Sequence, residues 1–136
     1  MSAGTRIADA YAIAVLGNDV YVAGNEWNGI VHIAKYWKNG VMTNLSDGTK
    51  DAQTFAITVS GNDVYVAGDE YNRSISVAKY WKNGVGTNLS DGAKPAHVTG
   101  ITVVGSDVYV AGHEWNGTIY DAKYWKNALL LTYPTV

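Results

Sequence analysis

The sequence repeats itself every 44 residues, and this repeat constrains the fold more than any other feature. The segment GNDVYVAG begins at Gly17 and again at Gly61, and GSDVYVAG begins at Gly105. The segment AKYWKN keeps the same spacing at Ala34, Ala78 and Ala122. Self-similarity at such a period predicts three copies of one supersecondary unit that stack on one another.

Each copy contains three turn signals, which divide it into four strands. In the first copy they are Gly17-Asn18, Asn28-Gly29 and Asn39-Gly40. Gly-Asn favours a type II′ turn and Asn-Gly a type I′ turn, both of which join antiparallel neighbours. We therefore predict an all-β fold of three four-stranded antiparallel repeats within one domain, residues 1–136. The predicted repeats are about 10–48, 53–92 and 97–136.

The predicted strands are apolar on both faces. Val20 and Val22 share one side of a strand, and Tyr21 and Ala23 share the other. Such strands need cover on both sides, as the blades of a β-propeller have. The alanine that begins each AKYWKN segment leaves room for close approach between neighbouring sheets. The alternative is a β-trefoil, which has three repeats and closes on itself as a monomer.

The segments DVYVAG, AKYWKNG and TNLSDG resemble the tandem repeats of bacterial β-propeller proteins of unassigned function. The resemblance covers essentially the whole chain, although TNLSDG occurs only in the first two copies. The motif VYVAG is similar to kelch-type blades, but the Gly-Gly doublet of those blades is missing here. The resemblance implies a propeller built from blades of about 44 residues.

Three blades cannot close a ring, because propellers have about 4–8 blades. Six is the multiple of three in that range, so we expect a homodimer of two half-propellers. Blade 3 of one chain would pack against blade 1 of the other and cover two exposed apolar faces. The third copy ends in ALLLTYPTV. This tail either places Leu129 and Leu131 at the closing seam or is frayed.

One triplet, Glu-aromatic-Asn, recurs in every copy and is the candidate ligand site. Aromatic rings stack on sugars, while carboxylates and amides hydrogen-bond to hydroxyl groups. One site per blade would give a multivalent binder of glycans or small ligands. In the structural alternative, the rings pack between blades, the glutamates satisfy turn amides and the asparagines are turn residues. The predicted site residues are Glu26, Trp27, Asn28, Glu70, Tyr71, Asn72, Glu114, Trp115 and Asn116.

Catalytic and metal chemistry have no comparable signature. The chain has no cysteine, and its three histidines occupy positions that do not recur, so we expect them in loops or at the surface. We therefore expect no catalytic residue, no metal and no cofactor. The leading hypothesis is a non-catalytic binding or interaction module. The alternatives are a scaffold or propeller fragment without a ligand and, more remotely, a hydrolase or lyase with a central site.

The charge balance argues against two classes of partner. The net charge is −2 and charged residues make up 16% of the chain, so no basic patch for nucleic acid or for an anionic membrane is expected. The lysines of each KYWK segment are expected to lay their stems on the sheet with their ammonium groups in water. No signal peptide is recognisable, so we expect a cytoplasmic protein, or a secreted one if the chain is a piece of a longer precursor.

Overall fold

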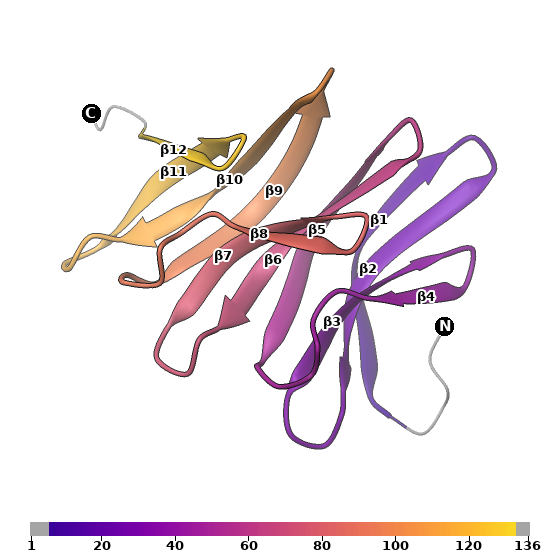
Figure 1. Ribbon diagram of the computed structural model, residues 1–136, viewed down its shortest axis with the longest axis horizontal. Helices are drawn as coiled ribbons and strands as arrows, with labels where there is room; N and C mark the ends of the chain where they lie inside the picture. Colours follow the sequence, from indigo (N-terminus) through magenta and orange to yellow (C-terminus); the bar gives the residue numbers. More distant parts are fainter. Residues whose placement is uncertain (1–5, 133–136) are drawn as a thin grey trace.

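The computed structural model describes residues 6–132, which form three four-stranded antiparallel sheets. Sheet 1 contains β1 (Ala8–Leu16), β2 (Asp19–Trp27), β3 (His32–Lys38) and β4 (Val41–Asn44). Sheet 2 contains β5 (Ala52–Ser60), β6 (Asp63–Tyr71), β7 (Ser76–Lys82) and β8 (Val85–Asn88). Sheet 3 contains β9 (Ala96–Val104), β10 (Asp107–Trp115), β11 (Tyr120–Lys126) and β12 (Leu129–Thr132). Figure 1 shows the three sheets side by side in chain order.

The all-β prediction and the order of four consecutive antiparallel strands per repeat are confirmed. The backbone at two of the predicted turns explains why these residues are there. Gly17 has φ +61° while Asn18 stays at negative φ, as a type II′ turn requires. Asn39 and Gly40 are both at positive φ, 50° and 84°, as a type I′ turn requires. Both turns recur at the matching positions of sheets 2 and 3.

The predicted two-residue turn at Asn28-Gly29 is wrong. The connection from β2 to β3 contains four residues, 28–31, and the flanking residues Trp27 and His32 are paired. The Asn28 side chain accounts for the difference, because its Oδ1 accepts hydrogen bonds from the backbone N–H groups of Ile30 and Val31, both at 2.9 Å. An asparagine that bonds to its own loop in this way builds an Asx-type turn in place of the tight hairpin.

The three sheets share the same strand register, including one irregularity. The first strand of each sheet has a bulge, at Tyr11, Phe55 and Thr99 respectively. A glycine in the second strand lies opposite each bulge: Gly24, Gly68 and Gly112. A Cβ atom at any of these glycines would overlap the carbonyl oxygen of a residue on the first strand. Glycine is therefore required here for close backbone approach.

The hydrophobic core lies between the sheets. We call the face of a sheet that packs on the next sheet its forward face, and the opposite face its rear face. In sheet 1 the forward face contains Tyr21, Ala23 and Ala34, all buried. These residues pack on the rear face of sheet 2, which contains Val64, Val66 and Trp81. The same pair of faces meets between sheets 2 and 3, where Tyr65, Ala67 and Ala78 pack on Val108, Val110 and Trp125.

Two faces have no sheet against them within residues 6–132. On the rear face of sheet 1, Ile13 is 67% exposed and Val15 is 63% exposed. On the forward face of sheet 3, Ala111 and Ala122 are exposed. The altered ending of the third copy forms β12 through Thr132, where Leu129 is exposed and Leu131 is half-buried. The rest of that tail, residues 133–136, lies outside the described residues.

Candidate functional site

The three residues of each Glu-aromatic-Asn triplet do not lie together in one site, because neighbouring residues of a strand point to opposite faces of the sheet. Glu26 lies on the rear face of sheet 1 and is 6% exposed. Its carboxylate is 3.2 Å from the Nζ atom of Lys35, which is 3% exposed. The expectation that the Lys35 ammonium group lies in water is therefore wrong. Glu70 makes the same ion pair with Lys79 at 3.1 Å, while Glu114 is half-buried.

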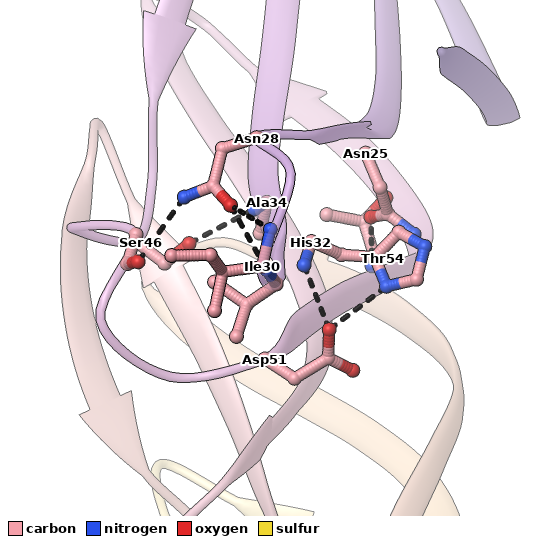
Figure 2. A network of polar contacts seen from close by, with 10 residues as sticks. Asn25, Asn28, Ile30, His32, Ala34, Ser46, Asp51 and Thr54 are labelled. Atoms are coloured by element: carbon pink, nitrogen blue, oxygen red, sulfur yellow. Dashed lines mark hydrogen bonds and ion pairs between the residues drawn. The ribbon is translucent and has the colours of Figure 1, made fainter. Parts of the chain in front are cut away.

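The asparagines of the triplets hold the loop that follows each second strand. Figure 2 shows Asn28 above the 28–31 loop, with its Oδ1 atom directed at the loop's own backbone. Its Nδ2 atom also donates a hydrogen bond to the carbonyl oxygen of Gly48. Asn72 repeats these bonds with Ser74, Ile75 and Gly92, and Asn116 accepts from Thr118 and Ile119. These amide oxygens already accept two hydrogen bonds each.

The aromatic residues of the triplets have different surroundings. Trp27 packs edge-on against the His32 ring at a centroid distance of 5.0 Å, and Trp115 packs in the same way against Tyr120 at 5.1 Å. Tyr71 is 44% exposed. Its ring lines a cavity of about 430 Å³ together with Asp51, Gln53, Phe55, Asp69, Ser76 and His97. Tyr71 therefore lies in a polar cavity together with a second aromatic ring, Phe55.

A buried carboxylate connects sheets 2 and 3 beside this cavity. Asp69 Oδ2 is 2.8 Å from His97 Nδ1, and Asp69 Oδ1 accepts a hydrogen bond from the Val98 backbone N–H at 3.2 Å. Burial raises the pKa of Asp69 above its usual value, and the hydrogen bond from His97 opposes that rise. The Asp69–His97 pair therefore combines a contact between sheets with an aspartate whose pKa is raised by burial.

Two related contacts link sheets 1 and 2 (Figure 2). Asn25 Oδ1 accepts a hydrogen bond from the Thr54 backbone N–H at 3.0 Å, which matches the bond from Val98 to Asp69. Asp51 Oδ1 lies 2.7 Å from the His32 backbone nitrogen and 2.8 Å from its Nδ1 atom. All three histidines lie in strands and not in loops, and His32 and His97, which are half-buried, each bind a carboxylate.

Sequence reasoning missed this set because it searched for residues that recur. The polar residues at the sheet junctions occupy positions at which the three copies disagree: Asn25, Asp69 and His113 are equivalent, as are Asp9, Gln53 and His97. The signal that could have identified them is that polar residues of different kinds occupy the same two positions of the repeat. In sheet 3 the rings of His97 and His113 lie 5.3 Å apart, and His113 packs on Tyr120 at 4.9 Å.

The chemistry open to this region is that of polar recognition. Gln53, Ser76 and Tyr71 offer an amide, a hydroxyl and a phenol at one cavity.

No cluster of three or more histidine, aspartate or glutamate side chains suited to a metal ion occurs among residues 6–132. In the same part of the chain, no helix is long and apolar enough to cross a membrane. The chain matches no protein-family model, and no curated protein is significantly similar to it.

Proposed function

We propose that the chain is a self-assembling binding module, a half-ring of three blades that a second copy completes to a six-bladed propeller. One observation carries this proposal. Both junctions inside the chain bury a forward face against a rear face, and the two end faces that no sheet covers within residues 6–132 are one of each kind. A copy placed head to tail could therefore form the junction that the chain already forms twice.

The exposure of matching residues supports the proposal on the rear face. Val64 and Val108 are 5% and 6% exposed, whereas their counterpart Val20 is 39% exposed. Ile13 is exposed, while its counterparts Ile57 and Ile101 are half-buried. The apolar side chains are thus the same in all three sheets, and the presence of a neighbouring sheet accounts for the difference in exposure.

The forward face of sheet 3 offers the complementary surface. Ala67 and Ala78 are fully buried under sheet 3, while their counterparts Ala111 and Ala122 are exposed. A hollow of about 520 Å³ lies on sheet 3, with Gly100, Tyr109 and Tyr124 among its lining residues. Large uncovered apolar surfaces mark interaction sites in soluble proteins. A twofold head-to-tail contact would cover both end faces at once.

The solution mass tests this proposal. Light scattering on the purified chain at increasing concentration should give the mass of two chains of 14.6 kDa. A compact monomer that persists at high concentration would contradict the half-ring and favour the closed trefoil. A larger, open-ended series of species would show that the head-to-tail contact forms without closing a ring.

Ligand binding at the Tyr71 cavity is a second candidate function. The cavity combines two aromatic rings with free amide and hydroxyl groups, as sites for sugars do. Titration with mono- and disaccharides, followed by intrinsic fluorescence, should report binding that Tyr71→Ala abolishes. Trp115→Ala is the matched comparison. An unchanged response in Trp115→Ala points to this single cavity, whereas equal losses in the two variants point to one site per blade, and no response to any sugar contradicts glycan binding.

A further inference from the structure

We infer that His113 forms an ion pair with Asp9 of the second copy, at the junction that closes the ring. This inference rests on the proposed head-to-tail assembly and adds to it a specific polar contact. The pair would match the one between Asp69 and His97, with the acid and the base exchanged between the two sheets. The partner copy would therefore complete a polar contact that one chain leaves unfinished.

The strand register identifies the two residues. In sheets 1, 2 and 3 the residues paired across the first two strands are Asp9 with Asn25, Gln53 with Asp69, and His97 with His113. At the junction of sheets 2 and 3, Asp69 on the second strand meets His97 on the first strand of the following sheet. If sheet 1 of another copy followed sheet 3, the same two positions would be occupied by His113 and Asp9.

Both side chains are available for this contact. Asp9 is exposed, and its carboxylate has no hydrogen bond or ion pair within residues 6–132. His113 is half-buried, and its ring contacts are to His97 at 5.3 Å and Tyr120 at 4.9 Å. Neither ring contact supplies His113 with a negative partner.

The charges around His113 favour an incoming carboxylate. The groups near it are the His97 imidazole, the Tyr120 phenol and the Asp69 carboxylate, which already binds His97. Two adjacent imidazoles thus share one carboxylate within the chain. Asp9 of a second copy would supply a second carboxylate. The side chains of Asp69, His97, His113 and Asp9 would then follow one another across the junction. Complementary charges of this kind fix the register and orientation of an interface.

The experiment exchanges the charges in steps. Asp9→His places an imidazole opposite His113, and His113→Asp places a carboxylate opposite Asp9, so each single variant should dimerise at least about tenfold more weakly than the wild type. The double variant Asp9→His/His113→Asp restores an acid–base pair with the polarity of Asp69 and His97. It should recover most of the lost affinity. Association is measured by analytical ultracentrifugation at about pH 6, where imidazole carries substantial charge.

A mixture of the two single variants gives a sharper test. In a mixed dimer, one junction has the natural His113–Asp9 pair and the other has the exchanged pair. The mixture should therefore form a dimer at concentrations at which neither variant alone does so. Asp47→His is the matched control, because Asp47 is exposed and its carboxylate bonds only to Thr49 in its own loop. It should dimerise like the wild type.

The outcomes separate the ion pair from the assembly. If the wild type is a dimer and the single variants, shown to be folded by circular dichroism, dimerise equally well, the ion pair is wrong and the half-ring stands. If the single variants weaken dimerisation but neither the double variant nor the mixture restores it, the two residues do not meet. If the wild type itself is a monomer, the proposed head-to-tail assembly is wrong, and the ion pair that rests on it is wrong as well.

Discussion

Sheet 2 and the two outer sheets have nearly the same sequence and differ in how many of their faces are covered. In sheet 2, Val64 on the rear face and Tyr65 on the forward face are 5% and 4% exposed. In sheet 1 the same two positions are 39% and 4% exposed, because one face has no neighbouring sheet in the described part of the chain. Burial at these positions thus depends on an adjacent sheet and not on the residue.

A third position, occupied by a tryptophan, is buried in all three sheets. Trp37, Trp81 and Trp125 are 2%, 2% and 0% exposed, although sheet 1 has no sheet against its rear face. In sheet 2 the backbone of Gly86 on β8 and the Lys79 side chain lie over the Trp81 ring. The outer strands of sheet 2 therefore contribute to the burial of Trp81, which also packs on the forward face of sheet 1.

The largest effect is expected from a charge at the valine that distinguishes the sheets. Val64→Asp would bury an unpaired carboxylate between sheets 1 and 2 and lower the free energy of unfolding by more than about 4 kcal/mol. Val20→Asp, the same change on the uncovered face, should leave the chain folded but monomeric. Urea unfolding and light scattering measure the two effects. Equal destabilisation by both variants would contradict the comparison.

A substitution that disturbs backbone contacts within a sheet should lower the free energy of unfolding by the same amount in every sheet. Gly68→Ala would drive a Cβ atom into the carbonyl oxygen of Gln53, and Gly112→Ala would do the same at His97. We expect each to lower the free energy of unfolding by about 2–3 kcal/mol, since backbone must shift. Gly100→Ala is the control, because no atom lies within 4 Å of its added Cβ. Thermal unfolding would contradict the steric explanation if Gly100→Ala lost as much stability as Gly68→Ala and Gly112→Ala.

The two internal junctions should differ in their response to pH. The raised pKa of Asp69 means that its carboxyl group binds a proton more tightly in the folded chain than in the unfolded chain, so this stabilisation is complete below the unfolded pKa and is lost as pH rises through the folded pKa. Asp69→Asn removes this titration and copies Asn25 of the other junction. The stability of the wild type relative to this variant should therefore fall as pH rises above about 4.

Urea unfolding of both proteins at several pH values measures this difference. Asn25→Ala serves as the comparison, because it alters the junction of sheets 1 and 2 without touching Asp69. Its difference from the wild type should stay constant with pH. A difference between wild type and Asp69→Asn that rises with pH would show that the bond to His97 outweighs burial.

The smallest effect is expected at the last turn. Ala128 has φ +68°, where sheets 1 and 2 have Gly40 and Gly84 at φ +84° and +87°. Ala128→Gly should raise the free energy of unfolding by about 0.5–1 kcal/mol, because an alanine is strained at positive φ. Gly84→Ala should lower it by a similar amount in denaturant titrations. The prediction fails if Ala128→Gly is destabilising, which would mean that the packing of its methyl group outweighs the backbone strain.

Much of the fold could be predicted because it depends on local chemistry. The Gly17-Asn18 and Asn39-Gly40 turns follow from the φ values that their residues tolerate. The Asn28-Gly29 turn could not be predicted in the same way, since Asn28 bonds both to its own loop and to Gly48, twenty residues away. The candidate site was harder to predict for the same reason. Glu26 and Trp27 are neighbours in sequence but lie on opposite faces, while Asp69 and His97 meet across two sheets.

The sequence by itself determined the repeat, the number of strands and the two apolar faces of each sheet, because turn geometry and side-chain alternation act between near neighbours. Only the tertiary structure decided which faces meet, which charges are buried and which polar residues lie together at the junctions. Those features arise from contacts between residues about thirty positions apart, such as Asn25 with Thr54. The energy of such contacts depends on burial, which is created when sheets pack against one another.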